Sequence, residues 1–305
     1  PMIIDVHTHL TAAVYGTTMD DAAGEPFPAY AFSPTCRRAV NTIPNLRYLD
    51  EAGVDMAVLL PLPIPPGAEV PHFVTNEAAQ EQARLHPDRF LPFGVFDPRQ
   101  PGLTYADEIA KLVDAGCRGF GEWKPNPPGN SLRVDDPRVQ EIYALCGEAD
   151  LPVLLHLDGN INQDMDGFER MVRAFPGTRF IAHGPAWWAE MGADTGGGSA
   201  YPSGPIAAPG RCDTLLRECP NLYADISAGS GLRGMSRDAE YTAGFARRHW
   251  QQLLLGTDFP CTNGATKTTF GVDRSHLELV QGLDLPAEQR AAILGGNLLR
   301  ILRPA

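Results

Sequence analysis

Short runs of apolar residues alternate along the chain with amphipathic segments in which apolar residues recur every three or four positions. A strand buried on both faces is apolar throughout, whereas a surface helix has one apolar side. The pattern predicts eight strands, at residues 3–6, 56–62, 90–96, 117–123, 152–157, 179–182, 221–226 and 253–256. It predicts helices after them, at residues 45–53, 76–86, 105–116, 136–149, 167–175, 212–219, 237–249, 275–282 and 286–302.

Strict alternation of strands and helices implies parallel strands joined by right-handed crossovers. Eight such units in 305 residues fit one (β/α)8 TIM-type barrel, so residues 1–305 are expected to form a single domain. An open, doubly wound sheet is the alternative. The longest break in the pattern, residues 184–211, is rich in Gly and Pro and follows the sixth strand. We expect it to be a lid over the substrate.

The composition narrows the class of protein. With 25 basic and 37 acidic residues, the chain has a net charge of −12, which argues against nucleic acid as a partner. The longest apolar stretch, residues 54–64, is interrupted by Asp55, Pro61 and Pro63, and cannot cross a membrane. The N-terminus lacks the basic region of a signal peptide, and no C-x-x-C pair occurs among six cysteines. These features predict a cytoplasmic protein that acts on a small molecule, and they are compatible with a homodimer.

Metal-competent residues stand at the ends of several predicted strands. His7 and His9 lie two positions apart, so both imidazoles face one side of the first strand. The apolar runs 153–155, 180–182 and 253–255 lead to His156, His183 and Asp258. Because the C-terminal ends of barrel strands carry active sites, these side chains are expected to meet in a metal site.

At this point the sequence resembles the amidohydrolase superfamily, in its branch of decarboxylases, hydratases and lactonases. The similar segments are DVHTH, LLHLDG, FIAHG, LLGTDFP and the C-terminal ILGGNLLRIL, so the resemblance spans nearly the whole chain. It implies that His7, His9, His156 and Asp258 are metal ligands. It also implies that His183 is either a ligand of a second metal or a catalytic histidine.

Glu122 ends the fourth strand, and Lys124 faces the same side. In binuclear members of the superfamily a carboxylate at this place bridges two metal ions, whereas the decarboxylase-like members are mononuclear. The alternative is an ion pair of Glu122 with Lys124 or an arginine. We favour a ligand role, because the carboxylate would point into a ring of histidines. The prediction is therefore two divalent ions (Zn, Fe or Mn) per chain, with Lys124 available for substrate.

Four functions are compatible with these residues. The first is hydrolysis of an organic carboxylate, ester, lactone or amide by metal-bound hydroxide, with Asp258 and His183 as catalytic residues. The second is nonoxidative decarboxylation with one metal, which leaves His183 free. The third is a non-haem diiron monooxygenase on the same scaffold, because four histidines and two carboxylates also suit iron. A ligand-binding protein without catalysis is the fourth.

Further residues are expected to support the ligands or to contact the substrate. Asp5 and Asp158 each lie two residues from a ligand histidine, and either could orient an imidazole. Trp187 and Trp188 are interpreted as exposed aromatic residues that form a wall for the substrate, although packing in the core explains at least one. His72, after the second strand, is the other residue expected near the substrate.

The segment 229–234 reads G-x-G-x-x-G, as dinucleotide-binding turns do. Such a site needs a helix that begins inside the motif. We expect the next helix to begin only near Ser236, and therefore interpret the motif as a flexible loop at the barrel mouth. Arg233 in this loop is expected to meet an anionic substrate.

Overall fold

The computed structural model describes residues 1–10, 43–68, 70, 72–124, 132–158, 165–194, 199–259 and 274–302. The strands are β1 (Ile4–Thr8), β2 (Met56–Leu59), β3 (Phe90–Pro92), β4 (Phe120–Trp123), β5 (Val153–His156), β6 (Phe180–His183), β7 (Leu222–Asp225) and β8 (Leu253–Leu254). The helices are α2 (Ile43–Ala52), α3 (Asn76–Leu85), α4 (Tyr105–Asp114), α5 (Pro137–Glu148), α6 (Met165–Ala174), α7 (Pro185–Ala189), α8 (Arg211–Glu218), α9 (Ala228–Ser236), α10 (Ala239–His249), α11 (Ser275–Gln281), α12 (Ala287–Ala291) and α13 (Asn297–Ile301).

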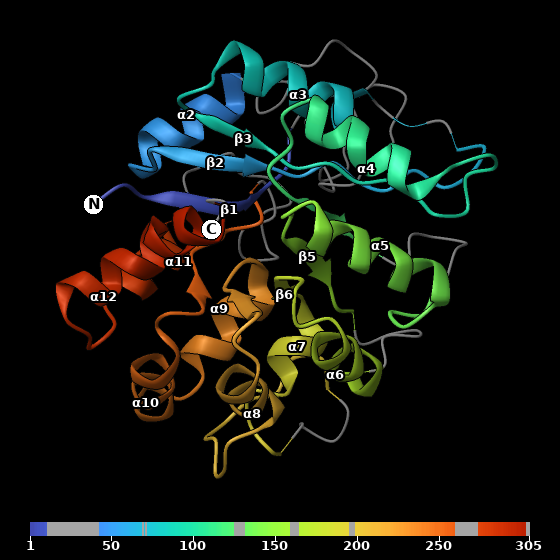
Figure 1. Ribbon diagram of the computed structural model, residues 1–305. Coiled ribbons are helices and arrows are strands. Elements are labelled where there is room, and N and C mark those ends of the chain that lie inside the picture. The colour runs from blue at the N-terminus through green and yellow to red at the C-terminus, as the bar shows by residue number, and fades with distance from the viewer. Residues whose placement is uncertain are drawn as a thin grey trace, which may run out of the picture.

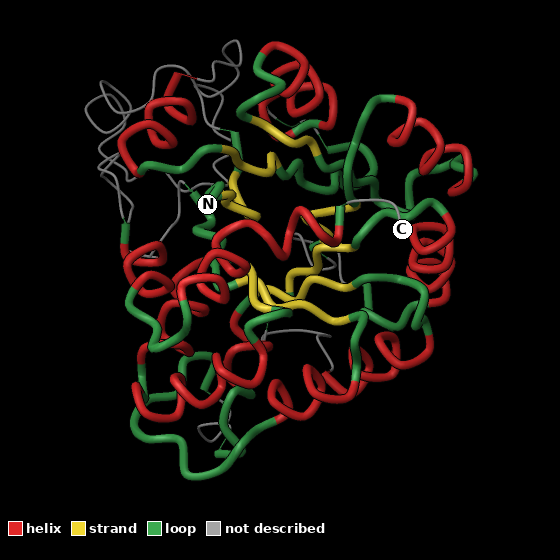
Figure 2. The backbone as a smooth tube through the Cα atoms, turned by 60° about the vertical axis from the view of Figure 1, so that its left-hand side comes forward, coloured by secondary structure: helices red, strands yellow, loops and turns green. Residues whose placement is uncertain are grey.

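The strands are parallel and follow one another in chain order, first β1 to β3 and then β4 to β8. Two short parallel bridges join these groups into a ring, between Gly94 and Phe120 and between Thr8 and Phe259. Figures 1 and 2 show the helices arranged around the strands. This arrangement confirms the predicted (β/α)8 barrel. None of the described helices is both long and apolar enough to pass through a bilayer.

The strands are apolar on both faces because each face packs on a different layer. Along β5, Leu154 belongs to the cluster inside the barrel, whereas Val153 and Leu155 pack in the outer cluster with the surrounding helices. Leu298 and Ile301 of α13 also join the inner cluster, so the C-terminal helix contributes to the barrel core. The polar residues of the site follow these apolar layers at the strand ends.

Side-chain caps fix the starts of several helices. The Thr75 side chain accepts a hydrogen bond from the Ala78 N–H at the start of α3, and Asp136 does the same for Arg138 at α5. At α10 the cap is Asp238, which accepts from the Tyr241 N–H. Such caps satisfy amide groups that have no partner within the helix.

Three expectations about local structure were wrong. The expected strand 90–96 is regular only as far as Pro92, and beyond it Gly94 forms an isolated parallel bridge with Phe120. The expected helix 286–302 is interrupted by a π-helical turn, Ala292–Gly296, between α12 and α13. The segment 184–211 is not free of regular structure, since it contains α7 and a bridge between Gly192 and Pro209.

The G-x-G-x-x-G segment lies inside α9 and is not a flexible loop. A Cβ atom on Gly231 would lie 2.2 Å from the Ile226 carbonyl oxygen, and one on Gly234 would lie 3.1 Å from Trp188. The glycines therefore allow α9 to pack closely on its neighbours. The next helix, α10, is capped by Asp238 rather than beginning near Ser236.

The π-helical turn generates a prediction about stability. A Cβ on Gly295 would lie 2.6 Å from the Met2 carbonyl oxygen, whereas one on Gly296 would be 3.5 Å from its nearest neighbour. Gly295→Ala should lower the free energy of unfolding by about 1–3 kcal/mol, as overpacking does. Gly296→Ala, the matched control, should be neutral or stabilising by up to about 1 kcal/mol. Urea denaturation with equal m-values checks this, and equal midpoints for both variants would contradict it.

Candidate metal centre

Six side chains from five strands converge where the strands end. His7 lies in β1, and His9 directly follows that strand. Glu122 lies in β4, His156 in β5 and His183 in β6, while Asp258 follows β8. All six are buried. The structure therefore brings together every residue that the sequence analysis predicted as a metal ligand.

The first group of ligand atoms consists of His7, His9 and Asp258. Oδ1 of Asp258 lies 3.3 Å from Nε2 of His9 and 3.5 Å from Nε2 of His7. Oε2 of Glu122 also lies 3.5 Å from Nε2 of His9. These separations suit atoms that share one small cation.

The second group consists of Glu122, His156 and His183. Oε1 of Glu122 lies 2.7 Å from Nδ1 of His156 and 3.9 Å from Nε2 of His183. The ligand atoms of each group lie within 4.8 Å of one another. Glu122 thus contacts both groups, with Oε2 near His9 of the first, and with Oε1 near the second and 3.9 Å from Nε2 of His7.

The hydrogen bonds of His7 and His9 fit a bound metal. Nδ1 of His9 lies 2.9 Å from the Leu60 carbonyl oxygen and Nδ1 of His7 lies 2.7 Å from Asp225, so the Nε2 atoms face the cluster. Nε2 of His7 and Oε2 of Glu122 are buried and have no hydrogen-bond partner within the described part of the chain. A buried polar atom without a partner is costly, and a cation at this point would satisfy both atoms.

Charge interactions favour ionised carboxylates in the cluster. Burial alone would raise the pKa of Glu122, but His156 and His7 hold it well below the usual value. Burial likewise opposes ionisation of Asp258, and His9 and His7 reverse the effect and lower its pKa. Burial, followed by the charge of Lys124, lowers the pKa of His156 to about 4. A neutral His156 beside ionised carboxylates is in the state in which such groups bind metals.

The backbone of Asp258 has a conformation that supports its role. Its φ is +65°, in the left-handed region that residues other than glycine rarely adopt. Its N–H donates a 2.8 Å hydrogen bond to the His7 carbonyl, which ties it to β1. Strain of this kind persists where neighbouring contacts hold a functional side chain in place.

Asp5 does not orient an imidazole as proposed from the sequence. Its Oδ1 accepts hydrogen bonds from the N–H groups of His7 and Thr257, and its Oδ2 accepts from the hydroxyls of Tyr48 and Thr257. Burial raises its pKa to about 7. Asp5 therefore fixes the backbone on both sides of the closure between β1 and β8.

Asp225 is the residue that the sequence analysis missed. It ends β7, and its Oδ2 lies 2.7 Å from Nδ1 of His7 and 3.4 Å from Nδ1 of His183. Burial opposes ionisation, but these two histidines hold the pKa of Asp225 below its usual value. The signal was present, because Asp225 also follows an apolar run at a strand end.

Trp187 and Trp188 are not exposed, which corrects the expectation of an aromatic wall at the mouth. Both are buried, and the ring of Trp187 packs edge-on against Phe168. Nε1 of Trp188 donates a 3.0 Å hydrogen bond to the Asp225 carbonyl. The two indoles pack between helices and a strand because their large apolar rings gain most from burial there.

Lys124 and Arg233 are two further residues expected to contact the substrate. Lys124 is close enough to lower the pKa values of both Glu122 and His156. Arg233 is exposed on α9, and its guanidinium lies 5.3 Å from the ring centre of Tyr201. Burial raises the pKa of Tyr201, although the charge of Arg233 opposes this shift.

His72 begins a 3-10 helix, His72–Val74, and its side chain is exposed. Asp158, the other aspartate expected to orient an imidazole, is half-buried just after β5. The roles of both residues remain predictions.

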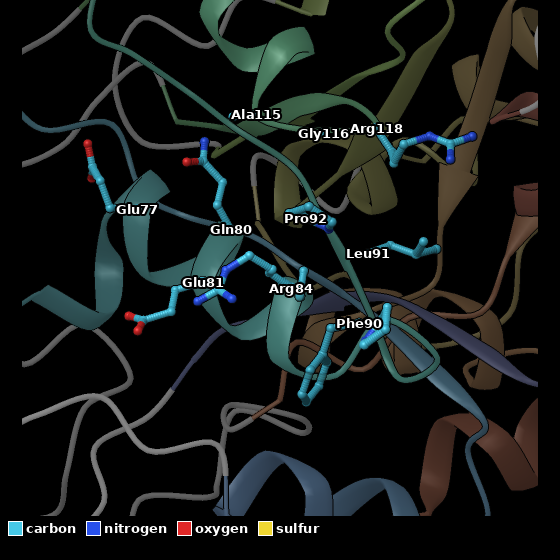
Figure 3. A pocket seen from close by; sticks show the side chains of 12 residues that line it. Glu77, Gln80, Glu81, Arg84, Phe90, Leu91, Pro92, Ala115, Gly116 and Arg118 are labelled. Atoms are coloured by element: carbon cyan, nitrogen blue, oxygen red, sulfur yellow. The ribbon is translucent and has the colours of Figure 1, made fainter.

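A surface cavity of about 470 Å³ lies elsewhere, beside α3. Figure 3 shows Gln80, Arg84, Leu91 and Arg118 around it. Phe90 begins β3 and Arg118 precedes β4, so the cavity lies toward the start of these strands. It contains none of the residues of the metal centre.

The family model described as amidohydrolase matches residues 4–303. Among curated protein sequences, none matches the chain.

Solved structures of similar fold span almost the whole chain. A probable 2-pyrone-4,6-dicarboxylic acid hydrolase from Acinetobacter baumannii has 14% identity and a TM-score of 0.62, with 99% of each chain covered. A 5-carboxyvanillate decarboxylase from Sphingomonas paucimobilis has 18% identity and a TM-score of 0.60, with 100% of this chain and 99% of that one covered. A 5-carboxyvanillate decarboxylase from Novosphingobium aromaticivorans, complexed with manganese, has 15% identity and a TM-score of 0.62, with 99% and 96% covered.

These structures share the fold, while the family match extends along the sequence from β1 to beyond α13 and includes every strand end of the metal centre. The chain therefore belongs to the amidohydrolase family and is a metal-dependent enzyme of the amidohydrolase superfamily.

Proposed function

We propose that the protein is a binuclear, metal-dependent hydrolase that acts on an organic carboxylate, ester, lactone or amide. The position of Glu122 carries the proposal. Its Oε2 lies near His9 of the first ligand group, whereas Oε1 lies near His156 and His183 of the second and, at 3.9 Å, near His7 of the first. A carboxylate placed in this way is suited to bridge two ions.

Nitrogen and oxygen donors without thiolate suit Zn, Fe or Mn. When bound, such ions supply Lewis acidity, which polarises a substrate oxygen and lowers the pKa of water to about 7. Manganese is bound in one decarboxylase of the same fold, and this is compatible with the donor set here.

Asp258 is suited to move protons during hydrolysis. Its lowered pKa leaves it ionised near neutral pH, and its Oδ1 faces the centre beside His7 and His9. It would accept a proton from the attacking water and donate it to the leaving group, as general base and then general acid. Lys124 and Arg233 would attract an anionic group of the substrate, and His183 completes the second ligand group.

Two other reactions remain alternatives within this site. Decarboxylation is the reaction named for two of the similar structures, and it would need one metal and a free His183. Diiron oxygen chemistry would use the same four imidazoles and two carboxylates with iron. Because the carboxylate oxygens of Glu122 contact both ligand groups, we favour two bound ions over one. Two ions in turn favour hydrolysis over mononuclear decarboxylation.

We also propose that the part of the chain between β6 and α8 acts as a lid. It is attached to the ends of α9 and α10, because Arg237 pairs with Asp194 at 2.9 Å and the Ile206 N–H donates to Asp238. Tyr201 of this segment lies over Arg233. The segment would therefore cover the substrate from the side of α9.

The first prediction concerns metal content. Protein expressed in metal-replete medium should contain about two transition-metal ions per chain, and His7→Ala should remove most of them because the first ligand group loses one of its three donors. Glu122→Gln should lower the content toward one ion. Elemental analysis measures both, with His86→Ala as a histidine control away from the centre. An unchanged metal content in Glu122→Gln would contradict the bridging role and favour an ion pair between Glu122 and Lys124.

The second prediction concerns proton transfer. Asp258→Asn should reduce kcat by about 10²-fold or more, while substrate binding is largely retained, because the amide cannot accept and return a proton. The exposed Asp284→Asn is the matched control and should behave as the wild type. Near-normal kcat in Asp258→Asn would exclude this residue as the essential acid–base group.

The third prediction separates hydrolysis from its alternatives. Zn-loaded enzyme should turn over under nitrogen, because neither O₂ nor a reductant takes part in hydrolysis. Activity of Fe-loaded and Zn-loaded protein is compared with and without O₂, and carbon dioxide release is measured. Activity only with iron and O₂, with ¹⁸O from O₂ in the product, would overturn the proposal. Stoichiometric release of carbon dioxide without hydrolysis would favour the decarboxylase.

A further inference from the structure

Asp225 contacts residues of both ligand groups, yet the proposed function gives it no task. Its Oδ2 lies 2.7 Å from Nδ1 of His7 and accepts a 2.7 Å hydrogen bond from Oγ of Ser227. Oγ of Ser227 in turn lies 2.7 Å from Nδ1 of His183. One buried carboxylate is thus connected to two imidazoles that belong to different ligand groups.

We propose that Asp225 is a positioning residue that holds His7 directly and His183 through Ser227, so that both Nε2 atoms point into the metal centre. The part of the proposal that concerns metal binding rests on the proposed function. The part that concerns the orientation of the two rings rests on the hydrogen bonds alone.

The direction of the hydrogen bonds follows from the chemistry of serine. A hydroxyl has one proton, so when Ser227 donates to Asp225 it accepts from the N–H at Nδ1 of His183. Asp225, as a carboxylate, accepts from the N–H at Nδ1 of His7 in the same way. Both rings then carry their proton on Nδ1 and have a lone pair on Nε2. In both rings that Nε2 lies 3.9 Å from Oε1 of Glu122.

The surroundings hold Asp225 in one place. A Cβ atom on Gly256 would lie 2.1 Å from Oδ1 of Asp225, so the segment after β8 passes at a distance that only glycine allows. The Asp225 carbonyl accepts a hydrogen bond from Nε1 of Trp188. The carboxylate is therefore confined by packing as well as by its hydrogen bonds.

The turn after β7 is equally constrained and fixes Ser227. Its N–H donates a 2.9 Å hydrogen bond to Oδ1 of Asp225. The next residue, Ala228, has φ +60°, and its N–H and carbonyl bond to the Thr257 carbonyl and to Nε2 of His276. A left-handed residue held from two sides leaves little freedom for the hydroxyl to turn away from His183.

These contacts distinguish Asp225 from a metal ligand. His7, His183 and Asp225 do have potential ligand atoms within 4.8 Å of one another. However, Asp225 faces the Nδ1 atoms, and its two oxygens are taken up by His7 and by the N–H and hydroxyl of Ser227. A carboxylate in this position orients a ligand and sets its tautomer.

The test compares Asp225→Asn and Ser227→Ala with a matched control, Ser230→Ala. Ser230 is also buried near the start of α9, and its hydroxyl has no hydrogen-bond partner in the described ranges. The control therefore removes the same atoms without touching either imidazole. Circular dichroism confirms folding, and Ser227→Ala carries the test if Asp225→Asn does not fold.

Two measurements are made on each variant. Zn²⁺ binding to metal-free protein is titrated in competition with a chelator, and the ¹⁵N shifts of the histidine rings are recorded without metal. Asp225→Asn should weaken both binding steps by about 10- to 100-fold and change the shifts of His7 and His183. Ser227→Ala should weaken one step and change only His183. Ser230→Ala should match the wild type in both measurements.

The outcomes separate this inference from the proposed function. The inference would be overturned if Asp225→Asn and Ser227→Ala had the same Zn²⁺ affinities and ring shifts as Ser230→Ala. This holds even if the enzyme is a hydrolase. Equal effects of Ser227→Ala on His7 and His183 would also overturn it. If the wild type binds no Zn²⁺ but the ring shifts change as expected, the proposed function fails and the positioning role of Asp225 is supported.

Discussion

Closure of the barrel between β8 and β1 is the constraint on which the site depends. The Val6 N–H donates to the Leu255 carbonyl, and the Asp258 N–H donates to the His7 carbonyl. Asp5 reinforces this closure by accepting hydrogen bonds from both sides of it. Because the same bonds close the ring and place Asp258 beside the first two histidines, formation of the barrel also assembles the first ligand group.

The site is a polar layer at the end of an apolar barrel. Leu154, Ile181 and Leu254 fill the interior, and His156 and His183 follow at the ends of their strands. Burial of two carboxylates is costly unless positive charge or hydrogen bonds compensate for it. Imidazoles supply part of this compensation, and a cation would satisfy the atoms of His7 and Glu122 that have no hydrogen-bond partner among the described residues.

Support for the ligands comes from residues that look unrelated in the sequence. Trp188 holds the backbone of Asp225, and Gly256 makes room for its carboxylate. Gly231 lets α9 approach the end of β7. Metal-ligating histidines commonly depend on such partners for their orientation. In this protein the glycines and the indole therefore contribute to the geometry of the centre without facing it.

The sequence by itself determined the order of the strands and helices, because apolar runs and amphipathic segments have different periodicities. It also placed His7, Glu122, His156, His183 and Asp258 at strand ends, which parallel strands bring to one edge. Tertiary structure alone decided which nitrogen of each ring faces inward, that both tryptophans are buried and that Asp225 joins two histidines. These features depend on contacts between residues far apart in the chain, and local periodicity contains no information about such contacts.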